Sequence, residues 1–157
     1  MVRFSSSSRF SSVNLDIILT QTDTTVGFLS KDEKKLKEIK SRGDNKPFIK
    51  VYHDFKTFLA SGNRIPSSKK NLVRRTKKTT FIVKNRAFRV SDKNLDSQIL
   101  RNTKWNYSTS ANESGKNFQR EFCELKADII IEDKKSLYEA KSSSLYKINS
   151  KKVKRLR

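Results

Sequence analysis

The sequence predicts one domain of the α+β class, close to α/β, and two observations support this class. Short apolar runs such as 17–19 and 129–131 alternate with segments in which apolar residues recur at helical spacing. Strands that alternate with helices are typical of a sheet covered by helices. With 157 residues, the chain is long enough to bury a core. We therefore expect a single domain over residues 15–157.

Residues 1–14 differ from the rest of the chain. They are rich in Ser and Arg and contain no acidic residue, as in a transit peptide, but no clear amphipathic helix runs through them. We expect a disordered tail.

The first half of the domain is predicted to alternate strands and helices. A buried strand at 15–20 is expected to lead into a polar turn at 22–25. Ser30, with Glu33 three residues later, matches a capping box, so a helix should follow, ending near Gly43. We then expect a strand at 48–52, a helix around 55–59 that ends at Gly62, and a helix after Pro66.

The second half is predicted to continue the pattern without internal repeats. We expect strands at 79–83, 87–90 and 105–109, helices around 95–100 and 118–122, and strands at 127–132, 145–148 and 153–156.

The chain carries 36 Lys and Arg against 16 Asp and Glu, a formal net charge of +20. Such an excess attracts polyanions, which makes nucleic acid or nucleotide phosphate a natural partner. Lysine that merely solvates the surface explains the same net charge equally well. Charge alone therefore does not identify an RNA.

Several classes of protein are not supported by the sequence. The single cysteine, Cys123, allows no internal disulfide and fits a reducing, cytoplasmic setting. With one histidine, His53, a structural zinc site or a hydrolytic triad is not expected. No apolar stretch approaches the ~18 residues of a membrane span. Neither the P-loop nor the Rossmann glycine motif occurs.

Three polar loops are candidates for a binding site, because open α/β sheets bind ligands where strands run into loops. The loop at 22–25 offers hydroxyls and one carboxylate, which either bind an amino acid or cap a turn. Lys40 and Arg42 either hold phosphate or carboxylate oxygens or complement a helix dipole. The loop at 108–112 is a plausible phosphate cradle.

In this order, the three loops resemble the signatures of the YrdC/YciO family of threonylcarbamoyl-adenylate synthases. The segment QTDTTVG at 21–27 is similar to the family's P-T-[DE]-T-x-Y-G, Lys40-Ser41-Arg42 to its K-x-R, and Ser110-Ala111-Asn112 to its S-x-N. Strand segments at 80–83, 88–92 and 127–131 also resemble family patterns, and 142–144 stands where P-S-T is expected. The resemblance covers residues 15–157.

The resemblance implies a twisted mixed sheet, flanked by helices, around a basic concave cleft. It also implies an enzyme that makes L-threonylcarbamoyladenylate and pyrophosphate from L-threonine, bicarbonate and ATP for t6A modification of tRNA. Magnesium is expected with ATP as the substrate complex, without a tightly bound protein metal. The implied partners are the proteins that transfer the threonylcarbamoyl group to tRNA, with RNA contact possible and no membrane.

The resemblance also implies roles for individual residues. Lys40 and Arg42 would be catalytic. The residues implied for ATP are Lys40, Arg42, Lys46, Thr80, Ser110, Asn112 and Arg157. The residues implied for threonine are Thr24, Lys84, Arg89, Ser108 and Ser144, with Ser143 as an alternative to Ser144.

The sequence departs from the family pattern mainly around threonine. Gln21 replaces a proline, Val26 a tyrosine and Gly43 a proline. Val51 stands where many members have a substrate-facing histidine, and His53 is either its substitute or a surface residue. These differences leave open a non-catalytic RNA-binding relative that uses the basic cleft. A carbamoyltransferase-like domain of a larger maturation protein is not expected, since no companion domain accompanies this one.

Overall fold

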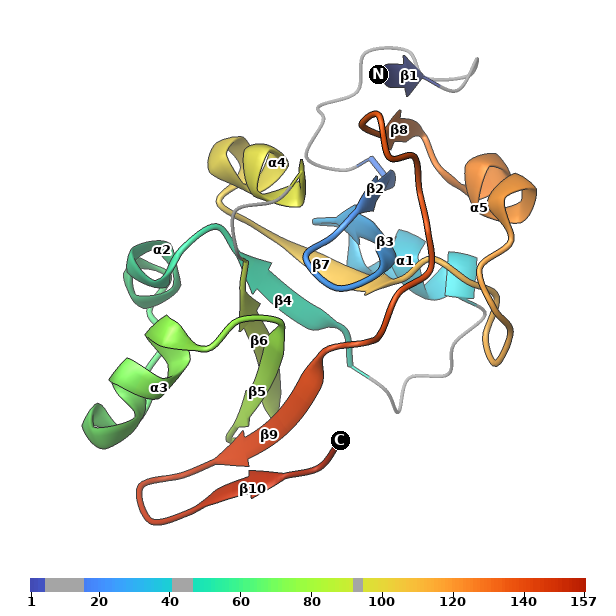
Figure 1. Ribbon diagram of the computed structural model, residues 1–157. Helices are drawn as coiled ribbons and strands as arrows, with labels where there is room; N and C mark the ends of the chain where they lie inside the picture. Colours follow the sequence, from blue (N-terminus) through green and yellow to red (C-terminus); the bar gives the residue numbers. More distant parts are fainter. Residues whose placement is uncertain (5–15, 41–46, 92–94) are drawn as a thin grey trace.

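A single mixed sheet organises the chain. The computed structural model describes residues 1–4, 16–40, 47–91 and 95–157 (Figure 1). Within these ranges ten strands lie in the order β1-β8-β2-β3-β7-β4-β6-β5-β9-β10. The strands are β1 (Val2–Phe4), β2 (Ile18–Gln21), β3 (Val26–Ser30), β4 (Ile49–Tyr52), β5 (Thr79–Val83), β6 (Arg86–Val90), β7 (Trp105–Ser110), β8 (Ile129–Ile131), β9 (Ser144–Ile148) and β10 (Val153–Arg155).

Helices cover both faces of this sheet. They are α1 (Glu33–Lys40), α2 (Phe55–Ala60), α3 (Lys70–Arg75) preceded by a 3₁₀ turn, η1 (Ser67–Lys69), α4 (Leu95–Thr103) and α5 (Arg120–Lys126). Figure 1 shows α2, α3 and α4 on one side of the sheet and α1 and α5 on the other. The α+β class with a twisted mixed sheet is therefore confirmed. None of the described helices is long and apolar enough to cross a membrane.

The central strands β2 and β3 are buried on both faces. Leu19 and Phe28 pack into a core that includes α1 and α5, while Ile18 and Leu29 point to the opposite face and pack near α4. Successive side chains of a strand point to opposite faces, so a strand covered on both sides needs apolar residues at every position. This explains the continuous apolar runs in the sequence.

A second core fills the other half of the sheet, under α2 and α3. It joins aromatic residues from four elements, and the rings of Phe58 and Phe88 stack with centroids 4.3 Å apart. Phe81 on β5 lies beside Phe88 on β6 and Tyr146 on β9. Packing of these rings holds the C-terminal strands to the sheet.

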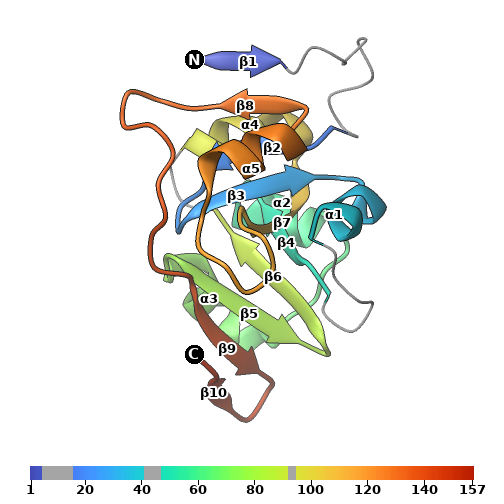
Figure 2. The ribbon, with the colours of Figure 1, turned by 90° about the vertical axis from the view of Figure 1, so that its right-hand side faces the viewer.

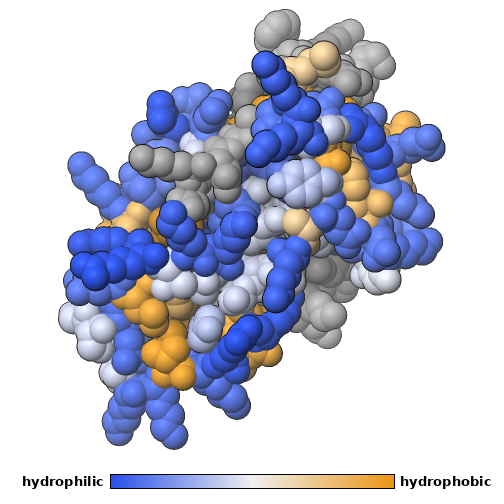
Figure 3. Space-filling model, in the orientation of Figure 1, coloured by the Kyte–Doolittle hydropathy of each residue, from blue (hydrophilic) through white to orange (hydrophobic). Residues whose placement is uncertain are grey.

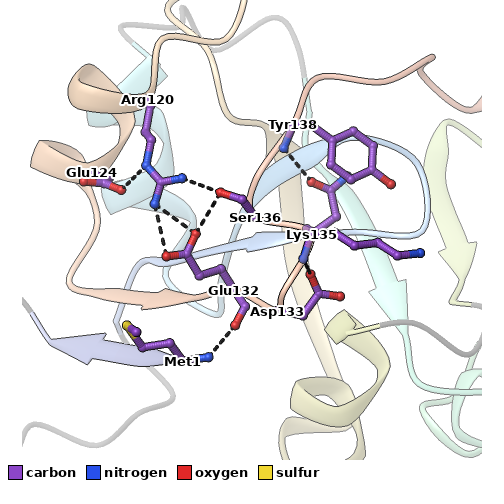
Figure 4. Close-up of polar contacts among 9 residues, drawn as sticks. Met1, Arg120, Glu124, Glu132, Asp133, Lys135, Ser136 and Tyr138 are labelled. Carbon is purple, nitrogen blue, oxygen red and sulfur yellow. Dashed lines mark hydrogen bonds and ion pairs between the residues drawn. The ribbon is translucent and has the colours of Figure 1, made fainter.

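Arg120 fastens α5 to the segment that follows β8 (Figure 4). Its guanidinium bonds Glu132 at 2.9 Å, Glu124 at 2.7 Å and the hydroxyl of Ser136 at 2.6 Å. Farther along this segment, the Tyr138 N–H donates to Gln21 Oε1 at 3.1 Å. These contacts lead the chain from β8 across the end of β2 and towards β9 (Figure 2).

Most of the expected elements are found, with three corrections. Strand β3 is not predicted from the sequence, because the pattern there indicates only a polar turn at 22–25 and a helix cap at Ser30. Ser30 ends that strand, and the N-cap of α1 is Asp32, whose Oδ1 accepts from the N–H groups of Lys34 and Lys35. At residues 2–4, where a disordered tail was expected, the chain forms β1 and pairs with β8. Gly43 and the rest of the expected tail lie outside the described residues.

Candidate functional site

A cavity of about 210 Å³ lies where the β2–β3 turn, the start of β4 and the end of β7 meet the segment before β9. Eight of its lining residues carry hydroxyls, two are arginines and none is acidic. The lining residues are Thr22, Thr24, Thr25, Val26, Gly27, Pro47, Phe48, Ile49, Arg89, Ser108, Thr109, Ser110, Ser142, Ser143 and Arg157. We call this the site cavity. Hydroxyl and guanidinium groups suit a ligand rich in anionic oxygens.

A second cavity of about 240 Å³ adjoins the first. The two share Thr25, Val26, Ser110 and Ser142, and the second extends to Asn112. Ligand pockets usually measure roughly 300–1,000 Å³. Neither cavity reaches that size alone, but the two adjoin through the lining residues that they share.

The β2–β3 turn is held by its own hydroxyls. Thr22 Oγ1 donates to the carbonyl of Thr25 at 2.7 Å and accepts from the N–H of Thr24 at 3.2 Å. On its other side, Thr25 Oγ1 accepts from the N–H of Ala140 at 3.0 Å. A turn fixed in this way presents its side chains in a defined arrangement without needing a ligand to order it.

A buried ion pair between Asp23 and Arg89 holds this turn in place. Arg89 on β6 lies 3.2 Å from Asp23, measured from Nε to Oδ1, and the two side chains are 5% and 0% exposed. Arg89 Nη1 also donates to Thr24 Oγ1 at 3.0 Å. Asp23 and Arg89 belong to segments far apart in the sequence, so the pair ties the turn to the other half of the sheet.

Asp96 on α4 is a second buried carboxyl near this pair. It is fully buried and accepts from the hydroxyl of Ser91 at 3.2 Å. Burial, followed by the charge of Asp23, raises its pKa to about 7, although Arg89 opposes the rise. The charge of one guanidinium is thus shared by two carboxyls, and burial favours the protonated form of Asp96.

Lys40 supports the loop after β7 rather than lining the cavity. Its side chain is buried, and its ammonium donates to the carbonyl of Ser110 at 3.0 Å and to Asn112 Oδ1 at 2.6 Å. The hydroxyl of Ser110 also donates to Asn112 Oδ1, at 2.7 Å. Lys40 therefore orders the Ser110–Asn112 segment and places a positive charge behind it.

The far wall of the site cavity is formed by the segment before β9. Ser143 is buried and shares a 2.8 Å hydrogen bond with Thr80 on β5. Arg157 Nε donates to the carbonyl of Ser143 at 3.1 Å, so the last described residue reaches back to the site. Thr80 lies behind Ser143 and positions it.

Gly27 allows β3 and β7 to approach closely at the edge of the site. A Cβ built on Gly27 would lie 3.0 Å from the carbonyl oxygen of Thr109 and 3.0 Å from Cγ2 of Thr22. Both distances are shorter than ordinary van der Waals contact, and one involves backbone. A side chain at this position would force the strands apart.

Metal ligands are scarce in this region. The site cavity has no carboxylate in its lining, and in the adjoining cavity Glu139 Oε2 accepts from the N–H of Phe118 at 3.1 Å. Across the described part of the chain, no group of three or more His, Cys, Asp or Glu side chains could hold a metal ion.

The residues that depart from the family pattern have identifiable structural roles. Gln21, in place of proline, holds the Tyr138 N–H through its carboxamide oxygen. Val26 is buried and lines both cavities, and Val51 is buried in β4. His53 lies beyond the end of β4 and lines a different cavity, with Arg74 and Arg101. It therefore lies outside the site cavity.

Sequence-predicted residues fall into three groups by position. Those that line the site cavity are Thr24, Arg89, Ser108, Ser110 and Arg157, and Asn112 lines the cavity beside it. Those behind the lining are Lys40 and Thr80. Arg42 and Lys46 lie outside the described residues.

Two predicted residues, Lys84 and Ser144, do not line the site cavity. Lys84 occupies the tight turn between β5 and β6, with φ of 46°, and lines a cavity with Gly62 and Arg64 instead. A two-residue hairpin turn points its side chains away from the sheet, which a strand pattern alone does not reveal. Ser144 pairs with β5 through its backbone, and its neighbour Ser143 lines the site cavity.

Sequence reasoning missed Asp96 and the structural need for Gly27. Asp96 sits in the first turn of α4, where an acidic residue normally only complements the helix dipole. Its burial depends on the approach of α4 to the β2–β3 turn, so no local signal marks it. Gly27 ends the segment QTDTTVG in the sequence, but its close contact with β7 follows from strand pairing.

Comparison with known proteins finds similarity among solved structures. No model of a protein family and no curated protein matches the chain. Among solved structures, P. abyssi Sua5 complexed with L-threonine is similar, with a TM-score of 0.73 and 18% identity over 90% of this chain and 50% of that one. E. coli YciO is similar with a TM-score of 0.71 and 16% identity over 90% and 82%. Full-length HypF in a phosphate- and nucleotide-bound form matches with a TM-score of 0.73 and 13% identity, over 100% of this chain and 25% of that one.

This chain thus spans about half the length of P. abyssi Sua5 and a quarter of full-length HypF. The identities are low, while the superpositions cover nine-tenths or more of the chain. Agreement of topology over such a length, at these TM-scores, identifies a common fold rather than a shared activity. The chain has the fold of the YrdC/Sua5 domain.

Proposed function

We propose that this chain is an L-threonylcarbamoyladenylate synthase, forming threonylcarbamoyl-AMP and pyrophosphate from L-threonine, bicarbonate and ATP. The observation that carries the proposal is the site cavity, which gathers hydroxyl and guanidinium groups from the β2–β3 turn, β6, β7 and the C-terminal segment. Two of the three sequence motifs meet there or beside it, and the third, through Lys40, supports the loop of the second. The product would serve t6A modification of tRNA.

Threonine is assigned to the end of the cavity near the β2–β3 turn. Thr24, held by Arg89, and Ser108 on β7 offer hydroxyls at this end, and Ser143 faces them from the C-terminal segment. Arg89 would complement the carboxylate of the amino acid. The L-threonine complex of a protein with the same fold supports this choice of ligand.

ATP is assigned to the side of the cavity towards the loop after β7. Ser110 and Asn112 would contact phosphate oxygens, with Lys40 adding positive charge behind the loop and Arg157 closing the far wall. Arg42 and Lys46 would supply further cations, and Mg²⁺ would arrive bound to ATP. A nucleotide-bound structure of HypF, a quarter of whose chain has the same fold, supports a nucleotide here.

The proposed reaction has two steps. The threonine amine takes up the carbon of bicarbonate, losing water, to form a carbamate. A carbamate oxygen then bonds to the α-phosphorus as the bond to the β-phosphate breaks, and pyrophosphate leaves. The chain would contribute positioning and stabilisation of charge on the phosphoryl oxygens, which are the main requirements of phosphoryl-type transfer.

Release of pyrophosphate tests the proposal. The purified chain is incubated with ATP, Mg²⁺, bicarbonate and threonine, and each component is omitted in turn. We expect pyrophosphate release that needs all four, and its loss in Lys40→Ala, since the Ser110–Asn112 loop would no longer be ordered. If ATP binds but no omission changes pyrophosphate release, the synthase assignment fails and a binding role for the cleft remains.

A further inference from the structure

Nearly all of the net positive charge of this chain comes from two segments of the sequence. Residues 55–91 and 140–157 contain 18 of the 36 Lys and Arg and none of the 16 Asp and Glu. The remaining 102 residues hold 18 basic and 16 acidic residues, so they are nearly neutral. A lysine-rich composition would spread the excess over the whole surface, and this distribution does not.

The fold brings the two acid-free segments together. Residues 55–91 supply α2, α3, β5 and β6, and residues 140–157 supply β9 and β10. Parallel pairing of β5 with β9 joins them, so the six elements form one end of the sheet, which we call the acid-free lobe. Figures 1 and 2 both place α3 and the β9–β10 hairpin at this end.

Nearly all of the lobe's cations face solvent. Of the 18, Arg89 is buried in the site, Lys69 and Lys70 are half-buried, and the other 15 are exposed. Hydrophilic side chains cover most of the lower part of the face in Figure 3, with small hydrophobic patches between them. The lobe therefore presents a wide cationic surface with no side-chain carboxylate of its own.

The β9–β10 hairpin concentrates this charge. Lys147 and Lys154 lie directly opposite each other in the antiparallel ladder, and both are exposed. Lys151 and Lys152 form the tip, where their N–H groups donate to Asn149 Oδ1. Like charges that face each other across a ladder destabilise it, so this arrangement lowers the stability of the hairpin unless an anion lies between them.

A second group of cations lies on α3. Arg74 and Arg75 are exposed in its last turn, following the half-buried Lys69 and Lys70. The guanidinium of Arg74 stacks over the ring of Phe55, 5.1 Å from its centroid, which holds it in a fixed orientation. Cations spread over separate elements match an extended row of anions better than a single phosphate.

We propose that the acid-free lobe binds the phosphodiester backbone of a nucleic acid, with the β9–β10 hairpin and α3 as the contact surfaces. Backbone phosphates supply regularly spaced charges, and Lys and Arg neutralise them with release of counterions. The hairpin and α3 lie outside both cavities of the site, so this surface is separate from the adenylating centre. The proposal does not depend on the synthase assignment.

Binding of labelled duplex RNA, single-stranded RNA and duplex DNA of equal length, measured over a salt series by fluorescence anisotropy, tests this proposal. The variants are Lys147→Ala with Lys154→Ala, and Lys151→Ala with Lys152→Ala. The control is Lys134→Ala with Lys135→Ala, which removes the same charge from two exposed lysines outside the lobe. Circular dichroism checks that each variant is folded.

We expect each lobe variant to bind roughly tenfold more weakly and to lower the slope of log affinity against log salt by about 1–2, because it removes two phosphate contacts. The control should bind within about twofold of the wild type. Saturating ATP, Mg²⁺ and threonine should not displace the nucleic acid. A preference among the three probes would then identify which nucleic acid the surface fits.

Four results would overturn the proposal. The lobe variants could bind as tightly as the wild type, or the control could weaken binding as much as they do. Full displacement by ATP would assign binding to the site cavity instead. Binding to vesicles that contain phosphatidylserine, without binding to any of the three nucleic acids, would assign the lobe to a membrane surface. Loss of pyrophosphate release in the lobe variants is not expected, so the two proposals fail separately.

Discussion

Arg89 is the residue on which the buried charges of the site depend. It is paired with Asp23, holds the hydroxyl of Thr24, and partly offsets the charge of Asp96. Breaking a buried ion pair by removing one partner leaves an uncompensated charge in a medium of low polarity. The conformation of the β2–β3 turn is therefore tied to the stability of the domain.

The substitution Arg89→Met should lower the free energy of unfolding by roughly 3–5 kcal/mol at neutral pH, because Asp23 would remain buried without its partner. Urea unfolding measures the change. Adding Asp23→Asn to this variant should restore part of the lost free energy of unfolding, because the unpaired buried charge would be removed. A loss below about 1 kcal/mol would mean that Asp23 is stabilised by other groups.

Asp96 should make stability depend on pH. Its pKa is about 7 in the folded chain and near its ordinary value of 3.8 when unfolded, so between these values the folded state holds a proton that the unfolded state has lost. As far as this group is concerned, stability should therefore be highest below about pH 4, fall as pH rises to about 7, and then level off. The total is a few kcal/mol, since each pKa unit corresponds to about 1.4 kcal/mol.

Urea unfolding between acidic and mildly alkaline pH, for the wild type and Asp96→Asn, checks this prediction. The difference in stability between the two should move in favour of the variant as pH rises through the window. Parallel profiles would show that Asp96 does not titrate there.

Gly27→Ala should affect both stability and ligand binding. The added methyl group would press on the carbonyl of Thr109 and on Thr22, and overpacking of this kind costs about 1–3 kcal/mol. Because Gly27 lines the site cavity, the KM for ATP or threonine should also rise. Unfolding curves and steady-state pyrophosphate release measure the two effects, and an unchanged KM would place the ligand away from β3.

At the scale of elements, sequence patterns located most strands and helices but not their pairing. β-Branched and aromatic runs correctly marked β5, β6 and β7. Strand β3 was missed because its short apolar run follows a polar turn and leads directly into Asp32, the true helix cap. Lys84 was assigned to threonine through the family resemblance alone, and the structure places it in the turn between β5 and β6.

The β9–β10 hairpin allows a prediction in which stability and binding change in opposite directions. Lys147→Glu would face Lys154 with an opposite charge, so the free energy of unfolding should rise by a few tenths of a kcal/mol, roughly, at low salt. The same change should weaken nucleic-acid binding. Thermal unfolding at low and high salt, alongside anisotropy, measures both.

Lys134→Glu is the matched control for this prediction. It makes the same change of charge at an exposed position outside the lobe. A hairpin that becomes less stable in Lys147→Glu would contradict the account of repulsion between Lys147 and Lys154.

At the scale of the whole molecule, the fold places the excess positive charge and the motif loops in different regions, although the sequence presents them together. The net charge alone could not be distinguished from general surface lysine. The structure shows where this charge gathers, because pairing of β5 with β9 brings two distant acid-free segments together. Such long-range pairing has no local signature in the sequence. The order of the three motif loops, in contrast, was readable from sequence and led to the correct fold.

The arrangement of the whole molecule also determines which residues of the site could be predicted from the sequence. Thr24, Ser108 and Ser110 lie at strand ends that the sequence marked, and these ends converge at one cavity. Ser143 was expected at the site from the resemblance of residues 142–144, whereas Asp96 comes near it only through packing of α4. Residues supplied by such packing cannot be found from spacing along the chain.

The most direct test of the central claim is the mass of the nucleotide product formed from carbon-13 bicarbonate, ATP and threonine. We predict an AMP-linked product that contains threonine and carries the label of bicarbonate, released with pyrophosphate. A threonyl-adenylate without the label would show adenylation by a different route. No AMP-linked product at all would contradict the assignment of the site cavity to threonylcarbamoyl-AMP synthesis.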